Sequence, residues 1–181
     1  MFPRVFVGIP IRVPTAQRCL SALPALPVPT ARLMPIQNWH ITLAFLGSCP
    51  DPIVVQVIRV LRRVFRPIRS FDVTVHDIHI VAHRGILALR VEPHPSIIRL
   101  AHAVRAGLHT VPGLPYVSGH GHTDFQPHVT IARHVPLDRA HGFPLRSSVV
   151  LPIRTVQLIA STLHPTGPAY RSRATFRLAP R

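Results

Sequence analysis

Hydrophobic residues follow two kinds of spacing along this chain, and together they predict strands interleaved with three helices. Short runs rich in β-branched and aromatic residues, or apolar residues that alternate with polar ones, are typical of strands. Segments of this kind are Arg4–Ile9, Trp39–Leu46, Phe71–Ala82, Gly85–Val91, His128–Arg133, Ile153–Leu163 and Tyr170–Leu178.

The other strong segments carry apolar residues at helical spacing. The predicted helices are Thr15–Leu23, Asp51–Phe65 and Ser96–Leu108, and the first residue of each is its candidate cap. Prolines in 24–35 and the Gly- and His-containing segment 111–124 predict loops. Because strands adjoin strands in this order, we expect antiparallel pairing and an α+β fold, with residues 1–181 as a single domain.

Composition narrows the class of protein. Apolar residues make up 47% of the 181 residues, which suits a packed core and excludes a disordered chain. We find no run long and apolar enough for a membrane span and no secretory signal, so we expect no membrane partner. Two cysteines are too few for a disulfide framework, which favours a reducing, cytoplasmic location. We also expect a monomer.

The charge is strongly positive. The chain has 21 basic residues, all of them arginine, against 6 acidic ones, for a net charge of +15. Codon usage in a GC-rich genome explains arginine in place of lysine, but it does not explain the scarcity of acids. A polyanionic partner such as nucleic acid explains both, because arginine binds phosphate in a bidentate manner.

One pattern occurs twice and carries chemistry. His40-Ile41-Thr42-Leu43 and His128-Val129-Thr130-Ile131 both lie in predicted strands, 88 positions apart, as an internal duplication would place them. Residues two apart on a strand share a face, so each copy presents an imidazole and a hydroxyl roughly 7 Å apart. A neutral histidine can take a proton from water, a protonated one can give a proton to a leaving oxygen, and the hydroxyls can bind phosphate oxygens. The pattern therefore predicts metal-free opening of a cyclic phosphodiester.

These residues resemble a known family. The segments Asn38–Gly47 and Phe125–Arg133 resemble the two signatures of the 2H phosphoesterases, and within them the RNA 2′,3′-cyclic phosphodiesterases, also called 2′-5′ RNA ligases. Ser161, Gly167 and Tyr170 stand in the order that the family's C-terminal strands show. The resemblance covers nearly the whole chain.

The resemblance implies more than the residues alone. It implies a bilobal fold with pseudo-twofold symmetry, in which two antiparallel sheets flank a central groove and helices lie outside. It implies that His40 protonates the leaving 3′ oxygen, that His128 activates water, and that Thr42 and Thr130 hold the phosphate. RNA would be hydrolysed to a 2′-phosphate, with reversible 2′-5′ ligation as a second activity and no cofactor. The residues by themselves do not say which histidine is the acid.

Several weaker candidates complete the picture. Arg133 is a candidate phosphate ligand, although an ideal strand would point it away from Thr130. Phe125 could stack on a base and Tyr170 could line the groove, but either could equally pack in the core or sheet. His120 and His122 have ligand spacing, yet the acid close by is Asp124 and no cysteine is near, so we expect no metal.

Two other functions stay open at this point. The same fold could act on a small cyclic nucleotide, or it could bind RNA without catalysis. The presence of both histidines and both threonines argues against the non-catalytic alternative.

Overall fold

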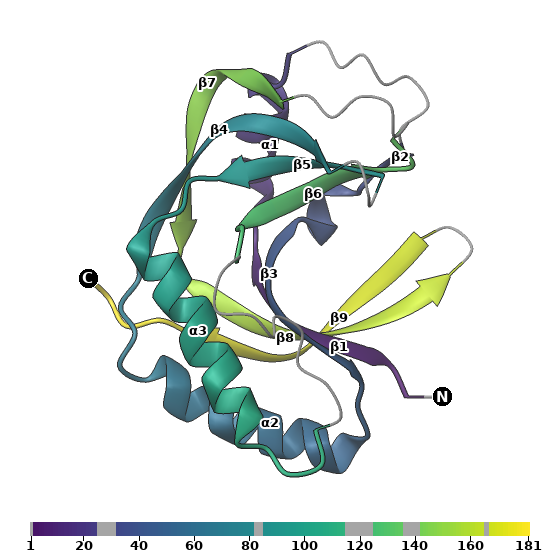
Figure 1. Cartoon of the computed structure of the whole chain (residues 1–181), viewed down its shortest axis with the longest axis vertical. Coiled ribbons are helices and arrows are strands. Elements are labelled where there is room, and N and C mark those ends of the chain that lie inside the picture. The colour runs from purple at the N-terminus through teal and green to yellow at the C-terminus, as the bar shows by residue number, and fades with distance from the viewer. Residues whose placement is uncertain (1, 25–31, 82–84, 115–124, 136–141, 165–166) are drawn as a thin grey trace.

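The hydrophobic runs of the sequence form strands that join into one strongly curved antiparallel sheet (Figure 1). The computed structural model describes residues 2–24, 32–81, 85–114, 125–135, 142–164 and 167–181. The elements are β1 (Arg4–Pro10), α1 (Val13–Ala22), β2 (Arg32–Leu33), the 3-10 helix η1 (Ile36–Asn38), β3 (His40–Ser48), α2 (Asp51–Phe65), β4 (Phe71–Val81), β5 (Ile86–Val91), α3 (Pro95–His109), β6 (His128–Arg133), β7 (Gly142–Ile153), β8 (Thr155–His164) and β9 (Gly167–Arg177).

The sheet consists of two similar halves. Its strand order is β7-β4-β5-β6-β3-β1-β8-β9, and β2 pairs with β6 beside this path. Four strands lie on each side of the junction between β6 and β3, where Ile41 pairs with Val129. The α+β class and the antiparallel pairing are thus confirmed. The two expected sheets are joined into one, because the strands that carry the His-x-Thr pairs, β3 and β6, pair with each other.

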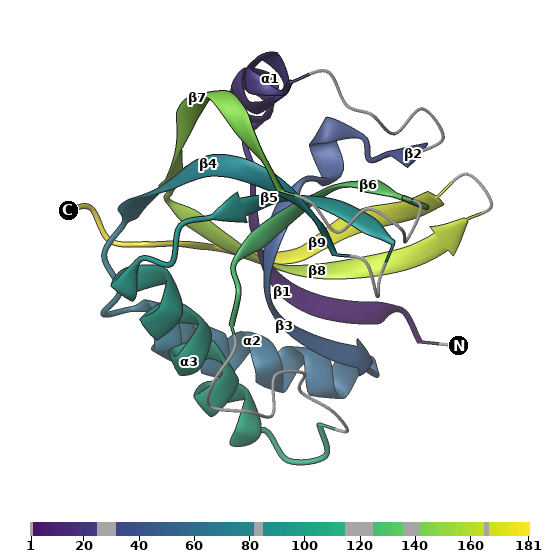
Figure 2. The same cartoon turned by 45° about the horizontal axis from the view of Figure 1, so that its top comes forward.

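The core lies on one face of this sheet. One face of the strands, with residues such as Leu43, Val75, Leu89 and Val129, is buried in one apolar cluster together with the apolar faces of the helices. Figures 1 and 2 show α2 and α3 together at one side of the molecule and α1 at the other. Gly107 of α3 allows the two helices to approach closely, because a Cβ there would lie 2.6 Å from Val64 of α2. The opposite face of the sheet carries the polar residues of the strands.

Helix starts differ slightly from the predicted caps. The first helix begins at Val13 rather than at Thr15, which is buried, and Pro14 lies in its first turn. The third begins at Pro95, and the ring of His94 takes the capping role by accepting from the backbone N–H of Ser96. Asp51 lies in the first turn of α2, where it forms an ion pair of 2.6 Å with Arg173 of β9.

Strand β7 was not predicted from the sequence. It contains Pro144 and Pro152, which remove backbone donors and disguise the strand pattern. In the sheet, β7 is the edge strand beside β4. An edge strand tolerates proline because one of its sides has no ladder to maintain.

Candidate active site

The register of the sheet brings the two His-x-Thr pairs onto one surface. Ile41 and Val129 are direct partners in antiparallel strands, and both are completely buried on the core face. The residues on either side of them therefore point to the opposite face. Extending the register places His40 beside Thr130 and Thr42 beside His128, with the histidines on a diagonal of roughly 7–8 Å between Cα atoms. All four side chains are half-buried.

Both histidines are held in the same way. Nδ1 of His40 donates to the carbonyl oxygen of Asn38 at 2.7 Å, and Nδ1 of His128 donates to that of Gln126 at 2.9 Å. A carbonyl can only accept, so Nδ1 carries a hydrogen in each ring, and Nε2 is the atom that can gain or lose a proton. Sequence reasoning did not find these backbone contacts. In both copies the accepting carbonyl belongs to the residue two positions before the histidine.

A bulge in β6 turns Arg133 toward the same surface. The pairing with β5 shows this bulge, because Ala88 pairs with Thr130 and Ile86 pairs with Arg133. A step of two residues on β5 therefore corresponds to a step of three residues on β6. The extra residue reverses the alternation. Arg133 therefore shares the face of Thr130, contrary to what an ideal strand predicts, and it is exposed there.

The same device occurs in β3. Gly8 of β1 pairs with Thr42 and Phe6 pairs with Phe45, again two residues against three. Phe45 thus shares the face of Thr42 at the position that corresponds to Arg133 in the other half, and 49% of it is exposed. Its ring lies 5.7 Å from that of Phe6. Sequence reasoning missed Phe45 as a site residue.

Aromatic rings enclose His40. Its ring centroid lies 4.7 Å from that of Phe6 and 5.3 Å from that of Tyr170, which meets it edge-on. Burial lowers the pKa of His40, the hydrogen bond to Asn38 opposes this, and the nearby His128 and Arg133 lower the pKa further. Burial raises the pKa of the Tyr170 hydroxyl, and Arg133 opposes that shift. The structure therefore brings Tyr170 to His40, and Arg133 within electrostatic reach of both.

Charged residues lie beside His128, whereas aromatic rings surround His40. Arg90 of β5 pairs directly with His128, and Asp77 of β4 pairs with Arg90. Nε of Arg90 lies 3.2 Å from Oδ1 of Asp77. His79, also on β4, has its pKa lowered by burial first and then by Arg90 and His128, while Asp77 raises it. The two histidines thus have matching backbone contacts but different surroundings.

With this geometry established, known proteins can be compared. A model of the 2′-5′ RNA ligase superfamily matches residues 31–152, more than half of the chain, and this span contains both His-x-Thr pairs. The chain belongs to this superfamily. No curated protein sequence matches it.

Solved structures share the fold of this superfamily member. TT0787 of Thermus thermophilus has a TM-score of 0.76 at 22% identity, covering 97% of each chain. Escherichia coli LigT complexed with 3′-AMP has a TM-score of 0.80 at 19% identity, covering 97% of this chain and 98% of LigT. The MHV ns2 PDE domain has a TM-score of 0.57 at 13% identity, covering 87% of this chain and 99% of that one. The 2H phosphoesterase fold is therefore confirmed.

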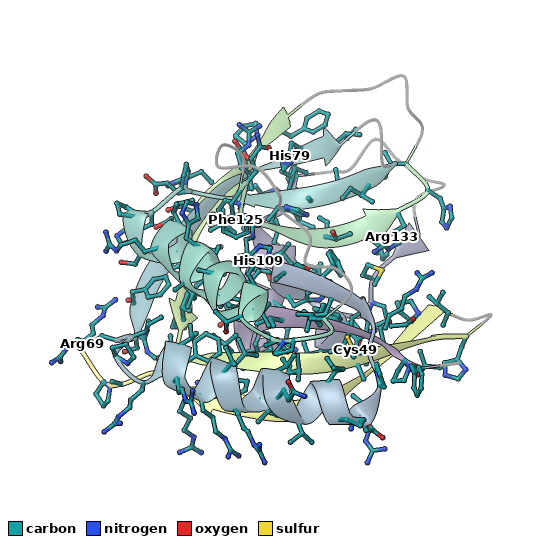
Figure 3. The ribbon with its side chains drawn as sticks, turned by 60° about the horizontal axis from the view of Figure 1, so that its bottom comes forward. Cys49, Arg69, His79, His109, Phe125 and Arg133 are labelled. Atoms are coloured by element: carbon teal, nitrogen blue, oxygen red, sulfur yellow. The ribbon has the colours of Figure 1, made fainter. Side chains whose placement is uncertain are left out.

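Phe125, a candidate for base stacking, lies elsewhere. It packs against the core cluster, and the guanidinium of Arg105 on α3 lies 5.0 Å from its ring centroid. Figure 3 shows Phe125 and Arg133 at opposite ends of β6, with Phe125 near α3. Its described contacts are thus on the helix side of the sheet, away from the histidine pair.

The metal alternative concerned His120 and His122, which lie outside the described residues. Within the part of the chain that the structure describes, no group of three or more His, Cys, Asp or Glu residues could hold a metal ion. Within the same part, no helix is long and apolar enough to cross a membrane.

Proposed function

We propose that this protein hydrolyses RNA 2′,3′-cyclic phosphate ends to 2′-phosphates without a metal ion. One observation carries the proposal: the Ile41–Val129 pairing sets both histidines and both threonines on one face, with each Nε2 left to exchange a proton. Phosphoesterase chemistry is the property of the superfamily as a whole. The cyclic RNA end as substrate is our inference from the site.

The chemistry follows from the arrangement of the four groups. The phosphorus atom lies between the histidines, with its non-bridging oxygens on the hydroxyls of Thr42 and Thr130. Nε2 of neutral His128 takes a proton from water as the water oxygen bonds to phosphorus. The bond from phosphorus to O3′ breaks, and Nε2 of protonated His40 gives its proton to O3′. The 2′-phosphate remains, and the two rings return to their starting states by exchange with solvent.

The role of His40 as acid places a condition on its pKa. Burial lowers the pKa of this ring in the free protein, which favours the neutral form. A bound phosphate anion acts in the opposite direction, because an opposite charge nearby stabilises the imidazolium. His40 would therefore be charged as proton donor once substrate is bound.

Two further residues complete the binding of substrate. Arg133 reaches the phosphate with a planar fork that can donate two hydrogen bonds, where negative charge accumulates in the transition state. Phe45, at the corresponding place beyond Thr42, presents an exposed ring on which the terminal base stacks. Escherichia coli LigT has been solved with 3′-AMP, which supports a nucleotide as the kind of ligand. In ligation, the 5′-hydroxyl of a second RNA would take the place of water.

The test is turnover of a short RNA that ends in a 2′,3′-cyclic phosphate, with a chelator present and the products resolved as 2′- or 3′-phosphates. We expect the 2′-phosphate. Absence of turnover would refute the proposal. Activity on small cyclic nucleotides would then support the second enzyme alternative, and tight RNA binding without any turnover would support the binding module.

A further inference from the structure

We propose that a pocket beside His40 binds the base of the second-last nucleotide of the RNA, the one before the terminal nucleotide that carries the cyclic phosphate. The substrate is then an RNA end of at least two nucleotides. This inference rests on the proposed function, and it chooses between an RNA end and a free cyclic nucleotide.

The pocket is a defined part of the groove face. It has a volume of about 210 Å³, which is enough for a planar base. Segments far apart in the sequence form it: η1 and the residues flanking it, the end of β1, and the β8–β9 hairpin. The lining residues are Pro10, Gln37, Asn38, Trp39, His40, Gln157, Ile159, Tyr170 and Ser172.

The chemistry of the lining favours a base over a phosphate. Apart from His40, the lining side chains are uncharged. Arg133 is not among them, although its charge acts on His40 and Tyr170 from the neighbouring strand β6. Two amides are oriented by their nitrogen atoms: Nδ2 of Asn38 donates to the carbonyl oxygen of Pro168 at 3.1 Å. Nε2 of Gln157 donates to Oγ1 of Thr175 at 3.2 Å. Within the described residues, each amide is therefore left with its oxygen as an acceptor and a second N–H as a donor.

Amides beside apolar and aromatic side chains match the pairing edge of a base, where donors and acceptors lie next to each other. The pocket is therefore expected to bind a base through stacking on its aromatic lining and hydrogen bonds to these amides.

The position of the pocket shows that two bases can bind at once. Along β3 the order is His40, Thr42, Phe45, all on the groove face. The pocket begins at His40 and includes residues before it, while Phe45 lies at the other end. A ribose held over Thr42 can place its own base on only one of these sites. The other site then receives the base of the neighbouring nucleotide, which a free cyclic nucleotide lacks.

The experiment compares kcat/KM for adenosine 2′,3′-cyclic phosphate with that for the dinucleotide ApA that ends in the same cyclic phosphate. We expect ApA to exceed the mononucleotide by about 10- to 100-fold, the range for one base contact. Gln157→Leu is expected to lower the value for ApA by roughly 3- to 10-fold, as for loss of one hydrogen bond, without affecting the mononucleotide. Ser172→Phe, which fills the pocket, is expected to remove most of the dinucleotide preference. Gln17→Leu, an exposed glutamine on α1, is the matched control.

Equilibrium binding separates this inference from the proposed function. Adenosine 2′-phosphate and ApA 2′-phosphate are titrated into the wild type and into Gln157→Leu by calorimetry, which needs no turnover. Tighter binding of the dinucleotide that Gln157→Leu weakens supports the pocket even if no substrate is hydrolysed. Equal affinity of the two ligands, or an equal effect of Gln157→Leu on both, overturns the assignment whether or not the enzyme turns over.

Discussion

Arg133 offers the sharpest test, because its place on the groove face depends on the bulge in β6. We expect Arg133→Ala to lose the hydrogen bonds that the guanidinium donates to the phosphate. A hydrogen bond to a charged group contributes roughly 1.5–3 kcal/mol. Two such bonds on an exposed side chain, partly replaced by water, give a loss of roughly 2–4 kcal/mol, or about 30- to 1000-fold in kcat/KM.

Two comparisons make the result specific. Arg133→Lys keeps the charge without the planar fork and is expected to fall between the wild type and alanine. Arg146→Ala removes an exposed arginine of β7 and is the matched control. The assay is the initial rate on an RNA 2′,3′-cyclic phosphate end. A loss of less than about threefold for Arg133→Ala would refute the reasoning from the bulge.

A second readout needs no substrate. Arg133 lowers the pKa of His40 through its charge. Its removal is therefore expected to raise that pKa, measured by NMR titration of the histidine ring. An unchanged titration would mean that the guanidinium lies too far from His40 to act on the phosphate there.

Three further outcomes are expected. Replacement of either His40 or His128 by alanine removes a proton-transfer group and lowers kcat by roughly 10²–10⁴-fold, while circular dichroism shows the same secondary structure; near-normal turnover in either variant contradicts the mechanism. Phe45→Ala lowers kcat/KM by about tenfold through lost base stacking, and Phe45→Tyr retains activity; equal rates for the wild type and alanine would place the base elsewhere. Burial lowers the pKa of His40 in the folded protein below the ~6.5 of an unfolded histidine. As pH falls, the unfolded chain therefore takes up a proton on this ring at a higher pH than the folded protein does. The contribution of His40 to stability is then complete above pH ~6.5 and is lost as pH falls through the folded pKa. His40→Phe flattens the urea-unfolding free energy against pH in that range, and parallel curves would contradict it.

The shared face of each His-x-Thr pair could be predicted from the sequence because it depends on local alternation. A strand puts residues i and i+2 on one face whatever its neighbours do, so His40 with Thr42 and His128 with Thr130 needed no tertiary information. The partnership of the two strands was implied only by the family resemblance. The direct contact at Ile41 and Val129 depends on the assembled sheet.

The bulges could not be predicted by the same reasoning. A bulge exists only relative to a partner strand, so an isolated strand pattern assigns Arg133 to the wrong face and overlooks Phe45. A signal was present nevertheless. The consecutive apolar residues Leu43-Ala44 and Ile131-Ala132 interrupt the alternation at the same point of both copies. Phe125 shows a second limit of reasoning from the sequence, because an aromatic residue beside a motif can pack on the core face of the sheet.

The repeated segments HITLAF and HVTIAR have matching backbones, yet the proposed reaction is asymmetric. Both segments have the same bulge and the same Nδ1 contact, so the side chain of the sixth residue and the Nε2 atom of the histidine are placed in equivalent ways. The proposed reaction needs one neutral and one protonated histidine, and two identical sites would titrate together. The asymmetry lies in the surroundings. Phe6 and Tyr170 enclose His40, Arg90 lies beside His128, and the sixth residue is Phe45 in one half and Arg133 in the other. Exchange of Phe45 and Arg133 would therefore disturb the charge near both rings while leaving the sheet unchanged.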